Sequence, residues 1–511
     1  MFKFKKITDI NGLDTNNINN AMQNSYAWCM AELGDYIYVG TSRNMFLNAS
    51  KAFGYTENNN LQAVPSIPSS SIDNSPEIWR YKKNSDCNRW ERVFKTDKND
   101  TLFGFRAMIT HKSHNSCAIY AAATGTHIAL YKSADGLHWK KIDTSNLTGK
   151  SSRALASLNG KLYIATLESG IGGNIPYLYA SPDPETKPFK KVINTESTNF
   201  ISCLNPMGGI DSLTVFNNKL YLGISTPTGA EIWRSDNCNP QNNRWTLIGD
   251  NGFGDSLNSS IMSTGIFKGH LYAAATKKLP LSLFMPFGFD LIRIDKDDKW
   301  ELVVGGKPIL PSHPTKGRRN CSISGFSSGF NSFFNIYGWQ IQEYKDNLLI
   351  TTYDGSGNVK AILDNYINNK DFYIKQLGES NYNNFIKYYT KINTILSKCD
   401  YPKGFDIYTS KDGCKFTPVI LDGLKNPNNY GGRTLLSTCD NKLYLGTANP
   451  QEGLEVWHIC YSKCTADYCS NKIITSYYSN LKCINKELRK IYPCLLPSLF
   501  KIFSNTTNTT F

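Results

Sequence analysis

Six side chains suited to ligand binding lie at, or one residue from, corresponding positions in an internal repeat of this 511-residue chain. They are Trp28, Arg106, Arg153, Asp211, Trp339 and Arg433. Guanidinium groups bind carboxylate, sulfate or phosphate, and indole faces bind sugar rings or cations. Alignment of the repeats places Thr434 in the last copy, with Arg433 one residue before it. We expect these residues to begin the innermost strands and to line a central funnel as a ligand site. Alternatively, Arg106 and Arg153 pair with Asp211 or loop carboxylates, and the ring only fills the channel.

The positions recur because the chain repeats an apolar strand, a tight turn and a second strand that ends in Gly/Ala-Thr. The clear copies are "WCMAELGDYIYVGT" (28–41), "RALASLNGKLYIAT" (153–166), "SLTVFNNKLYLGIS" (212–225), "TGIFKGHLYAAAT" (264–276), "WQIQEYKDNLLITT" (339–352) and "TLLSTCDNKLYLGT" (434–447), with a looser copy at 106–124. Turns such as Asn159-Gly160 and Asn217-Asn218 tolerate the positive φ of hairpin loops. The pattern predicts seven β-hairpins.

A second hairpin follows six of these units, and its outer strand starts at an aromatic residue. These residues are Trp90, Trp139, Phe189, Trp245, Trp300 and Phe416. Two successive hairpins form a four-stranded antiparallel sheet, and a series of such sheets is typical of a β-propeller.

The seventh copy contains a third strand, "LEVWHI" (454–459), but no fourth. The N-terminal "FKKIT" (4–8) aligns with the outer strand "WKKID" (139–143). We therefore predict an all-β fold over residues 1–459: a seven-bladed β-propeller of four-stranded antiparallel blades, in which the N-terminal strand closes the last blade. Such closure removes an exposed sheet edge.

Two outer turns, "SADGLHW" (133–139) and "SKDGCKF" (410–416), resemble shortened Asp boxes, the S-x-D-x-G-x-x-W hairpins of sialidase-like propellers. The repeat over 1–459 is similar to sialidase-like and Kelch-like architectures. This resemblance implies a propeller fold. It implies no activity, because Asp boxes stabilise turns on the outer hairpin.

Nearly all variation in loop length falls on one face of the predicted propeller. The long connections are 42–76, 277–288 and 353–404 within blades, and 194–210 and 305–338 between blades. Insertions on one face of a rigid scaffold mark the surface that carries function. In the blade-six insertion (356–403), apolar residues over 385–396 recur at helical spacing and predict a small helical insertion. That stripe either packs on neighbouring loops or forms a lid over the channel mouth.

A carbohydrate-active enzyme, a sialidase-like hydrolase or a lyase acting on an anionic glycan in the funnel, is the alternative to a binding protein. Arg106, Arg153 and Arg433 would imitate an arginine triad. However, hydrolysis needs two acidic groups or a Tyr–Glu pair, and the aligned ring shows Asp211 alone. No metal-ligand spacing, phosphate-binding loop or nucleophile elbow appears in a suitable context. We therefore expect no catalytic residue, no metal and no cofactor.

After residue 459 the repeat stops, and residues 460–511 form a basic, cysteine-containing C-terminal tail. Its cysteines are Cys460, Cys464, Cys469, Cys483 and Cys494. Cys87, Cys238 and Cys414 each fall in the outer turn of a different blade. In an oxidising compartment the tail cysteines would form disulfides and the turn cysteines would link neighbouring molecules; in a reducing one they stay free thiols. The apolar residues of 482–503 either dock on the propeller or bind a membrane or partner.

The net charge of +14 is spread along the chain, which does not favour a nucleic-acid partner. No apolar run is long enough to predict a transmembrane segment, and no signal peptide opens the chain. We therefore expect an intracellular protein, or a component packaged in a particle such as a virion, rather than classical secretion. The predicted function is a non-enzymatic binding or structural scaffold that engages a protein or glycan partner through the insertion-rich face, with self-assembly left open.

Overall fold

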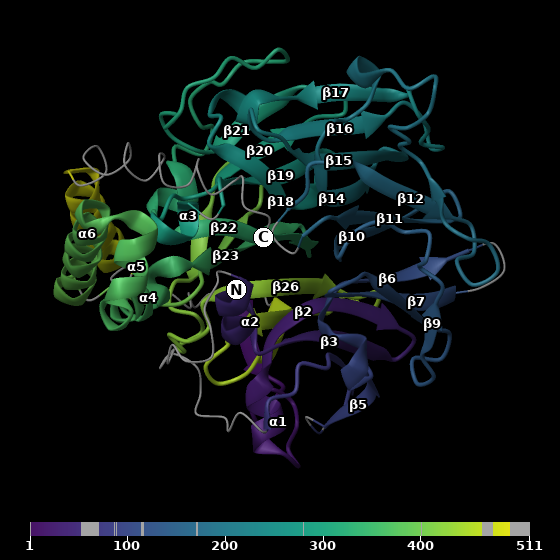
Figure 1. Cartoon of the computed structure of the whole chain (residues 1–511), viewed down its shortest axis with the longest axis horizontal. Coiled ribbons are helices and arrows are strands. Elements are labelled where there is room, and N and C mark those ends of the chain that lie inside the picture. The colour runs from purple at the N-terminus through teal and green to yellow at the C-terminus, as the bar shows by residue number, and fades with distance from the viewer. Residues whose placement is uncertain are drawn as a thin grey trace.

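The chain folds as a β-propeller of four-stranded antiparallel sheets, as the repeat predicts (Figure 1). The computed structural model describes residues 2–52, 71–85, 87, 89–113, 117–169, 172–279, 281–399, 401–461 and 474–490. Within these residues, strand pairing groups the strands into seven sets of four, called blades one to seven below.

The strands of each blade are given from the innermost outward. Blades one to three are β2 (Asn24–Leu33), β3 (Tyr36–Arg43), β4 (Glu77–Lys82) and β5 (Trp90–Lys95); β6 (Leu102–Lys112), β7 (Cys117–Gly125), β8 (Ala129–Ser133) and β9 (Lys140–Ile142); and β10 (Ser151–Leu158), β11 (Lys161–Leu167), β12 (Tyr177–Ser181) and β13 (Lys190–Lys191). Blades four and five are β14 (Gly209–Phe216), β15 (Lys219–Ser225), β16 (Glu231–Ser235) and β17 (Trp245–Gly249); and β18 (Asn258–Phe267), β19 (His270–Lys277), β20 (Asp290–Ile294) and β21 (Trp300–Val304). Blades six and seven are β22 (Asn335–Tyr344), β23 (Asn347–Asp354), β24 (Ile407–Ser410) and β25 (Thr417–Ile420); and β26 (Gly431–Ser437), β27 (Leu443–Ala448), β28 (Val456–Tyr461) and β1 (Phe2–Lys6).

The innermost strands surround the centre of the ring in Figure 1, and β26 packs against β2 to complete the circle. The predicted closing strand is confirmed, because β1 pairs antiparallel with β28 as the outer strand of blade seven. The register pairs Phe2 with Tyr461 and Phe4 with Ile459. The last propeller strand therefore runs to Tyr461, two residues beyond the predicted boundary at 459, since β1 supplies a partner that far.

Local turn chemistry explains why the repeat forms hairpins. Asn159 (φ 49°) and Gly160 (φ 69°) both adopt left-handed backbone, as a two-residue hairpin loop requires. In the outer turn of blade two, Ser133 Oγ accepts a hydrogen bond from Gly136 N at 2.8 Å, and Asp135 Oδ1 accepts one from His138 N at 2.9 Å. At the tip of the hairpin, polar side chains thus accept the hydrogen bonds of backbone N–H groups that have no partner in the opposite strand.

The blade-six insertion contains three helices, whereas the sequence predicted one: α4 (Asn358–Asn368), α5 (Lys370–Leu377) and α6 (Glu379–Lys398). The predicted stripe of α6 is buried against α4 and neighbouring elements. In Figure 1 these helices lie beside the ring of blades, away from its centre. The lid interpretation is therefore wrong, and the packing interpretation holds. Shorter helices are α1 (Ile18–Gln23), α2 (Met45–Ala52) and α3 (Leu281–Phe284), with 3₁₀ turns at Lys98–Asp100, Ser202–Leu204, Asn251–Gly254, Ser328–Asn331 and Gly355–Gly357.

Part of the C-terminal tail forms a helix over 474–490, which lies behind α6 in Figure 1. Its Tyr477, Leu481, Ile484 and Leu488 are buried in one core with the insertion helices. Docking of the tail's apolar residues on the propeller is thus confirmed for this helix. The rest of the predicted segment up to 503 lies outside the described residues. None of the helices placed in the structure is both long and apolar enough to cross a lipid bilayer.

Candidate functional site

A β-bulge in each innermost strand turns one residue out of the pairing ladder. In blade one, Ala27 pairs with Thr41 and Cys29 with Gly40, which leaves Trp28 without a cross-strand partner. A shift of this kind occurs at Trp28, Arg106, Arg153 (where Ser152 is out of the ladder as well), Asp211, Met262, Trp339 and Arg433. Bulges re-aim side chains and are frequent next to functional sites. We call these seven residues the axial ring.

The structure corrects two details of the predicted ring. The innermost strands begin two to four residues before the ring positions, so these residues do not start the strands. In blade seven the ring position is Arg433 and not Thr434, because Gly432 pairs with Thr447 and Thr434 with Gly446. The sequence copies were aligned on the Leu-Tyr pair of the second strand, and such an alignment does not show where the first strand contains a bulge.

Two ring arginines lie over the two ring tryptophans. The guanidinium carbon of Arg106 is 5.2 Å from the Trp28 ring centroid, and that of Arg433 is 5.2 Å from the Trp339 centroid. These are cation–π distances, and burial of the indoles makes such contacts stronger. The tryptophans therefore support the guanidinium groups.

The third arginine pairs with the ring carboxylate. Arg153 Nε lies 3.8 Å from Asp211 Oδ1, and its Nη1 lies 3.2 Å from the Met262 sulfur. Asp211 also accepts a hydrogen bond from Ser225. Arg106 donates to Ser151 Oγ at 2.6 Å. The expected alternative, in which ring arginines pair with Asp211, thus holds for Arg153. The ring contains three guanidinium groups and one carboxylate.

Burial, and after it the excess of positive charge, governs the pKa values of the ring side chains. Burial, followed by repulsion from Arg153 and Arg433, lowers the pKa of Arg106 well below its usual value. Burial and Arg153 lower the pKa of Arg433 to about 10. Burial raises the pKa of Asp211, which Arg153 partly offsets. Buried like charges are costly, and in the ring one carboxylate offsets them in part.

Four tyrosines pack around the ring tryptophans. They are Tyr26, Tyr337, Tyr353 and Tyr430. Tyr26 lies edge-on to both indoles, with centroids 6.4 Å from Trp28 and 5.9 Å from Trp339, and its hydroxyl hydrogen-bonds that of Tyr430. Burial raises the pKa of each phenol, to about 12 for Tyr337. All four are therefore neutral hydroxyl groups at physiological pH.

A pocket of about 720 Å³ opens on the insertion-rich face, between α4 and the loops of blade seven. Side-chain amides line much of it: Asn358, Asn365, Asn368, Asn428 and Gln451. Lys360 and Asp364 in its wall pair with each other at 2.5 Å, and Lys403 supplies a further cation. Tyr430 connects the lining to the tyrosine cluster beside the ring. The repeat analysis missed this pocket, because its wall comes from the insertion and not from the repeated unit.

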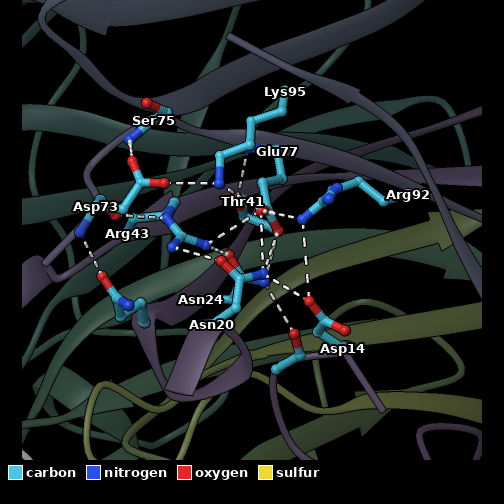
Figure 2. A network of polar contacts seen from close by, with 12 residues as sticks. Asp14, Asn20, Asn24, Thr41, Arg43, Asp73, Ser75, Glu77, Arg92 and Lys95 are labelled. Atoms are coloured by element: carbon cyan, nitrogen blue, oxygen red, sulfur yellow. Dashed lines mark hydrogen bonds and ion pairs between the residues drawn. The ribbon is translucent and has the colours of Figure 1, made fainter. Parts of the chain in front are cut away.

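A buried polar network fixes the same face in blade one (Figure 2). Its centre is the ion pair of Arg43 and Glu77, whose side chains are fully buried and 3.5 Å apart. Glu77 also accepts hydrogen bonds from Asn24 at 3.1 Å and from Arg92 at 3.0 Å. Burial alone would raise the pKa of Glu77, but Arg43 and these donors hold it below its usual value. The carboxylate is therefore charged and well satisfied.

The network joins segments that are distant in sequence. Arg43 Nε donates to the carbonyl oxygen of Asp73 at 2.7 Å, and Lys95 lies 2.6 Å from the Asp73 carboxylate. Asn20, from α1, donates to Glu77 at 3.1 Å. The returning end of the 42–76 insertion is thus tied both to its own blade and to the segment that follows β1.

An asparagine–acid contact like that of Asn24 and Glu77 recurs in other blades. The pairs are Asn24–Glu77 (3.1 Å), Asn258–Asp290 (2.9 Å), Asn335–Asp406 (2.8 Å) and Asn429–Glu455 (2.7 Å). Blades one and five add a buried cation at the end of the second strand, Arg43 and Lys277. Blade six has Asp354 at that place, so two carboxyl groups are buried together and the pKa rises to about 8 for Asp354 and about 7 for Asp406.

Blade six should lose stability as the pH rises from 4 to 8. Burial raises the pKa of Asp406 above its unfolded value, so its stabilising contribution is complete below about pH 4 and is lost as pH rises through about 7. In the wild type, the free energy of unfolding should be higher at pH 5 than at pH 8. In Asp406→Asn this difference should be smaller by at least about 1.4 kcal/mol. Urea unfolding at both pH values measures this difference. Equal pH dependence in the two proteins would contradict it.

The predicted cysteine positions are partly described. Cys87, Cys238 and Cys414 lie between the third and fourth strands of blades one, four and six, as expected, and each is a free thiol. Cys460 and Cys483 are exposed free thiols. Cys464, Cys469 and Cys494 lie outside the described residues. Cys399, which the sequence analysis did not select, lies 3.7 Å from Cys483, sulfur to sulfur.

The chemistry that the axial ring can perform depends on the side chains described above. A sialidase-like hydrolase needs two acidic groups or a Tyr–Glu pair. Among the ring positions Asp211 is the one acid, and it contacts Arg153. Within the described part of the chain, no group of three or more His, Cys, Asp or Glu side chains has the arrangement of a metal site.

No protein-family model and no curated protein matches this chain. Among solved structures it is similar to YCF48 bound to D1 peptide, with 10% identity, TM-score 0.44, and coverage of 90% of this chain and 97% of that one. The subtype N10 neuraminidase-like protein of A/little yellow-shouldered bat/Guatemala is 13% identical, with TM-score 0.33 and coverage of 69% of this chain and 94% of that one. The WD40 β-propeller domain of Doa1 is 10% identical, with TM-score 0.35 and coverage of 76% of this chain and 88% of that one. The β-propeller fold of this chain rests on the strand pairing described above.

Proposed function

We propose that this chain is a non-enzymatic binding protein or structural scaffold that engages a protein or glycan partner through its insertion-rich face. The observation that carries the proposal is the 720 Å³ pocket between α4 and the loops of blade seven. Binding sites on rigid scaffolds concentrate in concave regions formed by variable loops. Amide groups that both donate and accept hydrogen bonds suit the hydroxyl groups of sugars and the backbone of peptides.

The axial ring supplies the second part of the proposed site. We assign Trp28, Arg106, Arg153, Asp211, Trp339 and Arg433 to an acidic group of the partner. Three guanidinium groups against one carboxylate favour a carboxylate, sulfate or phosphate group. The indoles under Arg106 and Arg433 keep these cations in place.

Binding to glycan and peptide arrays should depend on both regions. Ala361 lines the pocket, so Ala361→Trp fills it and should reduce binding at least tenfold. Arg153→Ala should reduce binding of acidic array members while sparing neutral ones. Arg80→Ala is the control, because Arg80 pairs with Glu91 on an outer strand and contacts neither region. Array binding that survives both Ala361→Trp and Arg153→Ala would contradict the proposal.

A further inference from the structure

Two thiols from distant segments meet where the C-terminal helix crosses the insertion. Cys399 caps the C-terminus of α6, and its backbone N–H donates to Ile395 at 3.0 Å. Cys483 lies in the helix over 474–490. Their sulfur atoms are 3.7 Å apart, which is the one sulfur–sulfur contact among the described cysteines. We propose that Cys399 and Cys483 are a dithiol that oxidises reversibly to a disulfide and locks the C-terminal helix onto the insertion.

The packing around the pair holds the two thiols in register. Tyr477 donates to Asp406 at 2.8 Å, and Asn485 donates to the carbonyl oxygen of Asn331 at 2.6 Å. These contacts fix the helix on both sides of Cys483. A disulfide needs sulfurs about 2 Å apart, and rotation of the two side chains about χ1 is the motion that closes the remaining gap.

The position of the pair also gives an oxidant access. Cys483 is exposed and Cys399 is half-buried, so the sulfurs lie at the rim of the helix interface. Burial and the neighbouring Cys483 raise the pKa of Cys399. Oxidation should therefore speed up as pH rises, because the thiolate is the attacking form.

The reaction is thiol–disulfide exchange with a small disulfide such as oxidised glutathione. The Cys483 thiolate attacks one sulfur of the oxidant, the oxidant's S–S bond breaks, and one glutathione leaves as a thiol. Cys399 then loses its proton and attacks the mixed disulfide at the Cys483 sulfur, which releases the second glutathione. Two thiols are oxidised to one disulfide, and one small disulfide is reduced to two thiols.

Peptide mapping tests the proposal on the full-length protein. After oxidised glutathione, alkylation and trypsin, we expect residues 399–403 linked to residues 483–486, at least tenfold more abundant from folded than from urea-unfolded protein. Amide exchange over 474–490 should slow at least tenfold after oxidation and recover with a reductant.

Two variants make the result specific. Cys483→Ser should abolish the linked peptide and the protection of the helix, whereas Cys460→Ser, which removes another exposed thiol, should change neither. Separate glutathionylation of Cys399 and Cys483 without a link, or equal linkage in folded and unfolded protein, would overturn the proposal.

Discussion

Deletion of residues 2–7 is expected to lower the melting temperature by about 5 °C or more. Residues 2–6 form β1, the outer strand of blade seven, and the deletion removes the buried side chains of Phe2 and of Ile7, which follows the strand. Each fully buried large apolar side chain contributes about 1.5–3 kcal/mol. Their removal would also leave β28 as an open sheet edge.

The strand connects two blades, which makes the expected effect larger than the loss of one edge. Ile7 N donates to Val456 in blade seven at 2.9 Å. The carbonyl oxygen of Ile7 accepts a hydrogen bond from the Trp90 indole of blade one at 2.8 Å. Lys6 pairs with Glu455 at 3.1 Å. Loss of β1 therefore loosens the contact between the last and first blades.

Calorimetry of the truncated protein, with a peptide added in trans, measures this effect. A peptide of residues 1–9 should restore the melting temperature in a concentration-dependent way, and a scrambled peptide should not. The substitution Lys3→Ser with Lys5→Ser is the matched control, because both side chains are exposed on the same strand. A truncated protein that melts like the full chain would disprove closure by β1.

The fold was predictable because the repeat carries its own turn chemistry. Pairs such as Asn159-Gly160 occur between apolar strands, and their positive φ angles need no tertiary contact. The closing strand was predictable as well, since Phe4 and Ile7 reproduce the aromatic and apolar spacing of an outer strand. The three-helix insertion was only partly predictable, because α4 and α5 are short and are stabilised by packing in one core with α6.

The axial ring was predictable as a set of residues but not in its geometry. An aligned repeat shows that Arg106 and Arg153 are equivalent, yet a bulge appears only in the pairing of two strands. This is why Thr434 was aligned where Arg433 belongs. The sequence allowed Arg153 to pair with Asp211, but the choice depends on side-chain reach between adjacent blades, which no local pattern encodes.

The sequence contains one signal for the anchored acids. The motif E-x-W occurs in "EIWRYK", "EIWRSD" and "LEVWHI". In each copy the indole N–H donates to the glutamate two residues earlier, at 2.8 Å for Trp79, 2.7 Å for Trp233 and 3.0 Å for Trp457. Glu77 and Glu455 are buried and Glu231 is partly buried, so the motif marks an anchored glutamate. The cations that meet it, such as Arg43, come from another strand and remain unpredictable.

The substitution Glu77→Gln is expected to cost about 3–5 kcal/mol of unfolding free energy. It keeps the volume of the side chain but removes the charge that faces Arg43, which is fully buried. Arg43 would keep its hydrogen bonds to Asn24 at 2.8 Å and Asn20 at 2.9 Å, but no amide compensates a buried guanidinium as a carboxylate does. Urea unfolding of both proteins measures the cost.

The pair of Arg80, whose side chain is 12% exposed, with the exposed Glu91 provides the control for this prediction. Its ions are 2.7 Å apart, closer than those of Arg43 and Glu77, yet Glu91 is 54% exposed. Glu91→Gln should therefore cost no more than about 1 kcal/mol. Replacing both buried partners, Arg43→Met with Glu77→Met, should recover part of the loss, because no unpaired charge then remains inside. Equal costs for Glu77→Gln and Glu91→Gln would show that burial of the network does not govern its contribution, and that blade one is held by its apolar contacts alone.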